Sequence, residues 1–231
     1  MHKIKKETII VSIIFLISLI LFTSFAIAVG RNGGELKIDN KIVDFIYNHR
    51  GKKHNFNYYF NHFTTQLGYT YVTTAIMILT LIYTRFNRGW FCLLIGVLLC
   101  VILHMAIKDI FDRERPYEYM RWASETSLSF PSGHSTNSAF IYGFITYYVF
   151  KNNYSNKIKY SVLGSSITIV LLVMISRMIL SVHYFSDVIA GMSLGLIIMS
   201  LMIILYNVLE KHGIFNEPLI KIKKREESNE E

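Results

Sequence analysis

Long apolar runs separated by short charged segments dominate the chain. The first run, residues 8–30, has no charged residue, and as a helix it would span roughly 34 Å, more than the ~30 Å hydrocarbon core of a bilayer. Five more runs follow, at residues 63–84, 89–107, 131–150, 160–180 and 188–209. The pattern predicts an all-α fold, an integral membrane bundle of six transmembrane helices that forms a single domain over residues 1–231.

The first run has features of both a membrane anchor and a signal peptide. Three lysines precede it within residues 1–6, and Ala26-Ile27-Ala28 resembles a cleavage site. Because the apolar stretch is longer than the roughly 7–15 residues of a signal core, we predict an uncleaved anchor. Cleavage between Ala28 and Val29 is the alternative.

Residues 31–62 form a polar segment with two amphipathic stretches. In the first stretch, one helical face carries Ile38, Ile42, Phe45 and Ile46, and the other positions include Asp39, Lys41 and Asp44. The second stretch repeats the spacing with Phe56, Phe60, Phe63 and Leu67. The spacing predicts two short helices lying in the membrane interface. An ordinary loop with aromatic anchors explains it nearly as well.

The composition agrees with a membrane protein. Hydrophobic residues make up 52% of the chain and charged residues 17%, below the roughly 25% of soluble domains. The net charge of +8 is compatible with nucleic-acid binding, but the basic residues lie between the apolar runs and at the chain ends. We therefore expect the lipid bilayer, and no nucleic acid, as a partner. The sequence leaves the oligomeric state open.

The distribution of Lys and Arg predicts the orientation. Six helices place both termini on one side, together with the connections 85–89 and 151–159. The two connections contain two and three basic residues, respectively. The N-terminal segment contains three, and the charged tail 211–231 contains five. By the positive-inside rule, this side is therefore cytoplasmic. The 31–62 loop holds six, but long loops count less. The loops 109–130 and 177–187 are then extracytoplasmic.

Three charged clusters lie on this predicted outer side, each at the end of an apolar run. They are Lys108-x6-Arg115-Pro116, then Pro131-Ser132-Gly133-His134, and finally Ser176-Arg177 followed by His183 and Asp187. Hydropathy and loop charge alone therefore bring three cations, two histidines and a carboxylate to one depth of the membrane.

The first two clusters suit an anion. Arg binds phosphate bidentately and Lys acts as a point charge, and Pro116 should turn the chain so that Arg115 returns over the site. Pro-Ser-Gly is typical of a helix start, with Pro at the first helical position, and the free backbone amides at a helix start bind anions. Ser132 adds a hydroxyl donor, and His134 lies in the first turn. The alternatives are a Lys and Arg that snorkel at the membrane edge, which would suffice for the Lys108 cluster alone, and a capped helix with an interfacial His.

The third cluster adds a possible nucleophile. His183 and Asp187 are four residues apart and share a face if a helix begins near them. The carboxylate would fix the imidazole tautomer and leave the other nitrogen as nucleophile or base, whereas a solvated pair is the alternative. The same residues could bind zinc, but three cations would repel it and no His-Glu-x-x-His spacing occurs. We expect a phosphate site without metal or cofactor. His104, four residues before Lys108, either lines the same pocket or packs in the core, and we favour the core.

The three clusters together resemble the signatures of the type-2 phosphatidic acid phosphatase family, the lipid phosphate phosphatases. Lys-x6-Arg-Pro, Pro-Ser-Gly-His and Ser-Arg-x5-His-x3-Asp match in order, spacing and identity. The resemblance covers most of the chain, because bacterial integral members also have six transmembrane helices and a long first outer loop. Soluble vanadium haloperoxidases share the signatures, but the six apolar runs argue against that branch.

The resemblance implies a role for each residue. His183 would be the nucleophile that forms a phosphohistidine, Asp187 would orient it, and His134 would protonate the leaving oxygen. The phosphoryl oxygens would be held by Lys108, Arg115, Ser132, Gly133 and Arg177. Members of this type need no metal.

The resemblance also implies a function, a lipid phosphate or pyrophosphate phosphatase in the cell membrane. Bacterial members act on undecaprenyl pyrophosphate, phosphatidylglycerol phosphate, phosphatidic acid or diacylglycerol pyrophosphate, and an outward site favours the first. One alternative keeps the fold but passes phosphate to an acceptor other than water, as a membrane phosphotransferase does. Another is a small transporter, which predicts charges near helix centres rather than at helix ends.

Overall fold

The computed structural model describes residues 2–83 and 91–212, and within these ranges the chain is helical, without strands. The helices are α1 (His2–Arg31), α2 (Lys37–His49), α3 (Phe56–Gln66), α4 (Thr70–Tyr83), α5 (Phe91–Phe111), η2 (a 3₁₀ turn, Glu118–Met120), α6 (Gly133–Lys151), α7 (Asn156–Ile179) and α8 (Phe185–Lys211). The predicted connection 85–89 and nearly all of the tail 211–231 lie outside the described residues.

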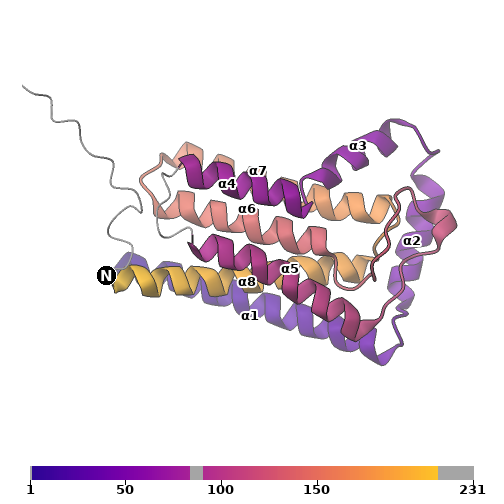
Figure 1. Cartoon of the computed structure of the whole chain (residues 1–231), viewed down its shortest axis with the longest axis horizontal. Helices are drawn as coiled ribbons and strands as arrows, with labels where there is room; N and C mark the ends of the chain where they lie inside the picture. The colour runs from indigo at the N-terminus through magenta and orange to yellow at the C-terminus, as the bar shows by residue number, and fades with distance from the viewer. Residues whose placement is uncertain (1, 84–90, 213–231) are drawn as a thin grey trace, which may run out of the picture.

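Six helices, α1 and α4 to α8, run roughly side by side, while α2 and α3 lie at one end of this bundle (Figure 1). Four of the described helices are long and apolar enough to cross a membrane: Lys6–Arg31, Phe91–Phe111, Asn156–Ile179 and Phe185–Lys211. The described part of α4 is shorter, and α6 carries buried polar residues in its first turns. The all-helical bundle is therefore confirmed, with four helices of clear membrane-spanning character.

The centre of the bundle is the packing of α6 against α8. Two glycines of α8 allow it: a Cβ at Gly191 would lie 2.3 Å from the Ser132 carbonyl oxygen, and one at Gly195 would lie 2.3 Å from that of Thr136. Small residues four apart let two helices approach closely in membranes. Phe140 and Ile198 pack beside this contact in the buried core.

The predicted span 63–84 is wrong at its beginning. Residues up to Gln66 belong to α3, a turn follows, and α4 begins only at Thr70. Gly68 lies in this turn, where a Cβ would lie 2.7 Å from Val173 Cγ1 and 3.0 Å from His134 Cβ. The chain at Gly68 passes so close to α6 and α7 that only a glycine fits without a shift.

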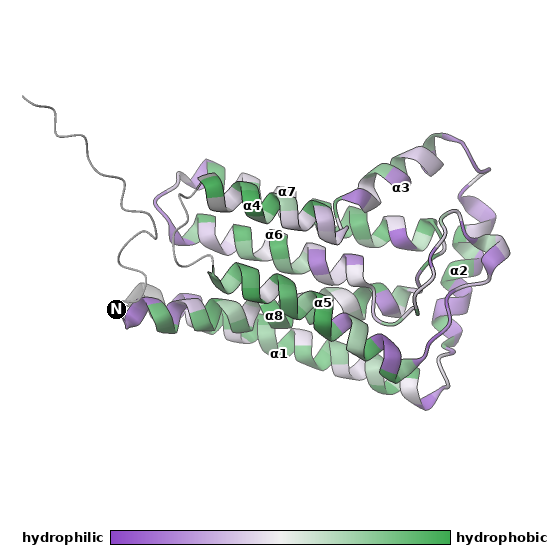
Figure 2. Ribbon diagram, viewed as in Figure 1, coloured by the Kyte–Doolittle hydropathy of each residue, from purple (hydrophilic) through white to green (hydrophobic). Residues whose placement is uncertain are grey.

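The two short helices are present, but α2 does not bury its apolar face. Ile38 and Phe45 are 53% and 63% exposed, whereas Asp39 and Val43 are buried. In α3 the apolar side chains Phe56 and Phe63 are also exposed. Hydropathy colouring shows polar residues gathered on α2, on α3 and in the loops at the bundle ends (Figure 2). Contact of the exposed apolar faces with the membrane interface stays a prediction.

The ends of the bundle differ in content. The start of α1 and the end of α8 lie together at one end (Figure 1). The loop after α5, the start of α6 and the loop before α8 lie at the other end, where α2 crosses (Figure 1). The three charged clusters are therefore gathered at the end opposite the described termini.

Gly195→Ala is expected to destabilise the protein by about 1–3 kcal/mol, because the new methyl group must displace the α6 backbone. Thermal unfolding in detergent measures this change. Gly164→Ala is the matched control, since nothing lies within 4 Å of a Cβ there. Equal unfolding temperatures for the two variants would contradict the close α6–α8 contact.

Candidate active site

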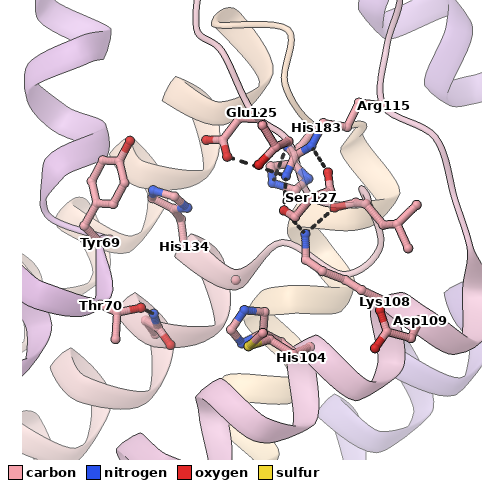
Figure 3. Close-up of a pocket in the computed structure, with 16 residues that line it drawn as sticks. Tyr69, Thr70, His104, Lys108, Asp109, Arg115, Glu125, Ser127, His134 and His183 are labelled. Carbon is pink, nitrogen blue, oxygen red and sulfur yellow. Dashed lines mark hydrogen bonds and ion pairs between the residues drawn. The ribbon is translucent and has the colours of Figure 1, made fainter.

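The charged clusters surround a cavity of about 380 Å³ between α4, α5, α6 and the loops that follow α5 and α7. Figure 3 shows His134 and His183 facing it from two sides, with Lys108 and His104 rising from α5. Five of the eight predicted site residues line the cavity: Lys108, Arg115, Gly133, His134 and His183. The other three, Ser132, Arg177 and Asp187, are buried behind them.

Lys108 is in the last turn of α5, and its Nζ donates to Ser127 Oγ at 3.2 Å and to the Leu128 carbonyl. The helix ends at Phe111, and Asp112 adopts a φ of +43°. The chain therefore reverses before Pro116, earlier than predicted. The reversal places the following loop over the helix end, so that Lys108 lies beneath it.

The same loop carries the Arg115 guanidinium into the site. Its Nε donates to the Ser127 carbonyl at 2.6 Å, and its Nη1 donates to the Val182 carbonyl at 2.6 Å. Nη1 also lies 3.2 Å from His183 Nε2. A guanidinium only donates, so His183 Nε2 accepts, and the proton of the neutral ring is on Nδ1.

His183 lies in the loop between α7 and α8 and is 1% exposed. Burial, followed by the charges of Arg115, Arg177 and Lys108, lowers the pKa of His183 well below its usual value. Burial also lowers the pKa of Arg115, to about 10, which leaves it charged at neutral pH. The site therefore combines a neutral imidazole with charged guanidinium groups, as nucleophilic attack on an anion requires.

Asp187 is at the third position of α8, and its Oδ2 lies 3.4 Å from His183 Nδ1, though not in line for a hydrogen bond. The same oxygen accepts from Ser129 Oγ at 2.5 Å and from the Tyr184 backbone N–H at 2.9 Å. The start of α8 thus brings the His–Asp pair together, as the spacing predicts.

The Pro-Ser-Gly-His cluster forms the start of α6, but Pro131 precedes the helix instead of occupying its first position. Ser132 is the N-cap, fully buried, and its Oγ accepts from the Ser135 N–H at 3.4 Å. A Cβ at Gly133 would lie 2.8 Å from His104 Nε2. His134 Nε2 is inaccessible to solvent and has no hydrogen-bond partner among the described residues.

His104 is not simply a packed core histidine. It lines the cavity beside Gly133 and Lys108, and its Nδ1 lies 2.6 Å from the Cys100 carbonyl oxygen. A carbonyl only accepts, so this Nδ1 carries a proton and Nε2 is the acceptor of the neutral ring. The signal in the sequence was the four-residue spacing between His104 and Lys108, which puts both side chains on the same face of a helix.

Sequence reasoning missed Glu125, in the loop between α5 and α6. Its Oε1 accepts from Arg177 Nη2, and its Oε2 lies 3.7 Å from Arg115 Nη2. Arg177 Nη1 donates to Thr65 Oγ1 of α3 at 2.9 Å. No motif marks Glu125, because its position depends on the path of an irregular loop. Its carboxylate holds two of the cations that are expected to bind phosphate.

Across residues 2–83 and 91–212, no group of three His, Cys, Asp or Glu side chains is arranged to hold a metal ion. The absence of a metal from the reaction stays a prediction.

At one end of a membrane-type helical bundle, a His–Asp pair thus lies beside three buried cations, Lys108, Arg115 and Arg177. The sequence profile of the PAP2 superfamily matches residues 89–211, more than half of the chain. The chain therefore belongs to this family, and the resemblance to type-2 phosphatidic acid phosphatases is confirmed.

Two Bacillus subtilis matches are informative. The chain is 39% identical over 101 residues to phosphatidylglycerophosphatase B of strain 168; the match covers 42% of this chain and spans about half, 48%, of that relative's length. The crystal structure of a transmembrane PAP2-type phosphatidylglycerolphosphate phosphatase from Bacillus subtilis superposes with a TM-score of 0.70 and 26% identity. That superposition covers 93% of this chain and 98% of the other.

The fold extends to a more distant protein. Aquifex aeolicus LpxE superposes with a TM-score of 0.58 at 21% identity, over 73% of this chain and 96% of the other. At this identity the likeness concerns the fold. The four apolar helices and the two Bacillus subtilis matches together indicate a multi-pass membrane protein.

Glu125→Gln is expected to tighten the binding of inorganic phosphate by up to about fivefold, since a partly exposed ion pair contributes up to about 1 kcal/mol. The substitution removes the carboxylate that competes for Arg115 and Arg177. Phosphate-dependent thermal stabilisation of the purified protein measures the affinity. Glu114→Gln, exposed on the same loop, is the control and should match the wild type. Unchanged affinity in Glu125→Gln would contradict competition at this site.

Proposed function

We propose that this protein is a membrane lipid phosphatase that hydrolyses a phosphomonoester or pyrophosphate through a phosphohistidine. One observation carries the proposal: the neutral, buried His183 directs Nε2 towards Arg115 in a cavity lined by cations. Family membership supports it, as do relatives named phosphatidylglycerophosphatase and phosphatidylglycerolphosphate phosphatase.

In the first step, the Nε2 lone pair of His183 attacks phosphorus, and the bond from phosphorus to the leaving oxygen breaks. His134, which the bound anionic substrate holds in its protonated form, gives a proton to that oxygen. In the second step, water attacks the phosphohistidine and passes a proton to His134, which releases phosphate and restores both rings. Asp187 stabilises the proton on Nδ1 of His183 throughout.

Charge on the phosphoryl oxygens is stabilised by groups that already converge on the cavity. In the ligand-free site, an N–H of Arg115 donates a hydrogen bond to His183 Nε2. When substrate binds, the same N–H donates to a phosphoryl oxygen instead, which frees the nucleophile. Lys108 and the Gly133 amide at the α6 start add donors, and Arg177 binds after Glu125 moves away. The Ser132 hydroxyl contributes indirectly, by capping α6.

The proposed site is extracytoplasmic. The positive-inside rule puts the termini in the cytoplasm, and the three clusters lie at the other end of the bundle (Figure 1). Thr70 of α4 and Met105 of α5 line the cavity, and Met105 and Ile102 are exposed apolar residues of α5. A lipid phosphate at the outer leaflet can enter the site there while its tail stays among these helices.

The proposed mechanism predicts that His183→Ala loses at least about 10³-fold of kcat, because the nucleophile is removed. Wild-type protein should form an acid-labile phosphoenzyme with labelled substrate and stay active in EDTA. The measurements are phosphate release and labelling of protein that is denatured in SDS at alkaline pH, where a phosphohistidine survives, with His49→Ala, exposed on α2, as the control. Full activity in His183→Ala, or loss of activity in EDTA, would contradict the mechanism.

The names of the relatives favour phosphatidylglycerol phosphate over undecaprenyl pyrophosphate as the substrate. We expect the highest kcat/KM for phosphatidylglycerol phosphate in a panel that also includes undecaprenyl pyrophosphate, phosphatidic acid and diacylglycerol pyrophosphate. Phosphate release in mixed detergent micelles measures it. A higher value for undecaprenyl pyrophosphate would instead support recycling of a carrier lipid for the cell wall.

A further inference from the structure

Asp39 of α2 is a carboxylate in an unexpected place. It is fully buried, although its neighbours Ile38 and Lys41 on the same helix are exposed. It reaches the start of α8, where its Oδ1 accepts from the Ser186 backbone N–H at 2.9 Å and its Oδ2 accepts from the Ser186 hydroxyl. Burying a carboxylate is costly unless it is paired, so its partners explain why it is there.

The charged partner of Asp39 is Arg113, which is 3% exposed. Arg113 Nη2 donates to Asp39 Oδ2 at 2.7 Å, and Nη1 donates to Asp187 Oδ1 at 2.5 Å. Nη1 also donates to Ser186 Oγ at 2.7 Å. One guanidinium therefore joins the carboxylate from the outer helix α2 to the carboxylate that faces His183.

The arrangement matters because Asp187 has two oxygens with different tasks. Oδ1 accepts a hydrogen bond from Arg113 Nη1, and Oδ2 lies 3.4 Å from His183 Nδ1. Arg113 alone would neutralise Asp187 and weaken its attraction for the imidazole proton. Asp39 offsets that charge, so the group Asp39–Arg113 is neutral and Asp187 keeps its negative charge for His183. Both carboxylates act on Arg113: burial lowers the pKa of this guanidinium, but Asp187 and Asp39 raise it above its usual value.

The attachment of α2 to the protein does not depend on Asp39 alone. Arg50, just beyond the other end of α2, donates to the Ile179 carbonyl at 2.7 Å and to Ser181 Oγ at 2.8 Å. Its guanidinium also stacks 4.2 Å from the Trp122 ring. A purely structural contribution of α2 is therefore testable at Arg50, separately from an effect on Asp187.

We propose that Asp39 is a positioning residue for the reaction at His183: it holds and neutralises Arg113, which fixes Asp187 in its orientation and charge. The amphipathic helix of the outer loop is then a supporting element of the active site. This inference rests on the proposed function.

The test is a double-mutant cycle in the full-length protein. Asp39→Asn is expected to lower kcat by about tenfold with little change in KM, because a contact beside the reacting pair, and not a substrate contact, is lost. In an Asp187→Asn background, Asp39→Asn should cause almost no additional loss. Asp44→Asn is the matched control, since Asp44 is exposed on the same helix and should keep wild-type kcat.

Two further variants separate positioning from folding. Asp39→Glu keeps the charge and should retain most of the kcat that Asp39→Asn loses. Arg50→Ala should lower the unfolding temperature, and any loss of kcat should be as large in the Asp187→Asn background as in the wild type. If Asp39→Asn does not fold, the cycle is run with Arg113→Lys, which keeps the positive charge but loses the planar fork that reaches both carboxylates from two nitrogens.

The outcomes distinguish this inference from the proposed function. Full activity of His183→Ala would overturn the proposed function and the inference that depends on it. If His183→Ala is inactive while Asp39→Asn matches Asp44→Asn, only the inference is overturned. Equal fold-losses for Asp39→Asn with and without Asp187 would likewise overturn it, because they would indicate a general structural effect.

Discussion

The burial of positive charge at one end of the bundle is the constraint on which the rest of the structure depends. The four cations in and directly behind the candidate site, Lys108, Arg113, Arg115 and Arg177, are each at most 7% exposed. Removing such groups from water costs several kcal/mol per ion unless hydrogen bonds and opposite charges replace the lost hydration. The loops at this end meet that requirement with backbone carbonyls, hydroxyls and three carboxylates.

The partners divide the cations into two groups. Arg113 has permanent anionic partners in Asp39 and Asp187 and belongs to the frame of the site. Lys108, Arg115 and Arg177 are held by carbonyls, by Ser127 and Thr65, and by the single carboxylate of Glu125. Those three cations therefore keep unused capacity for an anion, which suits a phosphoryl group. The distribution of the carboxylates therefore leaves the cavity positive and holds Arg113 in place beside it.

The helices support this distribution by close packing. Gly191 and Gly195 bring α8 against α6, so the N-cap Ser132 is buried and the two helix starts lie next to each other. His134 and His183 therefore approach the cavity from separate elements. Gly133 leaves room for His104, and Gly68 lets the turn between α3 and α4 pass beside His134.

Much of the site could be predicted because its residues are adjacent to the ends of apolar runs. Hydropathy locates those ends, and the spacing of Lys108 to Arg115 and of His183 to Asp187 then indicates which side chains meet. The same reasoning failed for Asp39 and Glu125. Asp39 belongs to the polar side of an amphipathic helix, and periodicity alone assigns that side to solvent. Glu125 lies in a loop without periodicity.

The sequence by itself determined the helical bundle, its family and the gathering of three charged clusters at one end, because hydrophobicity and spacing act locally along the chain. Only the tertiary structure decided which counter-ion holds which cation, and that α2 turns its carboxylate inward and its apolar face outward. Those choices depend on contacts that local periodicity does not reach, such as Asp39 with Arg113, 74 positions apart, and Glu125 with Arg177, 52 positions apart. Electrostatic pairing in a buried site is set by three-dimensional distance, which no local pattern encodes.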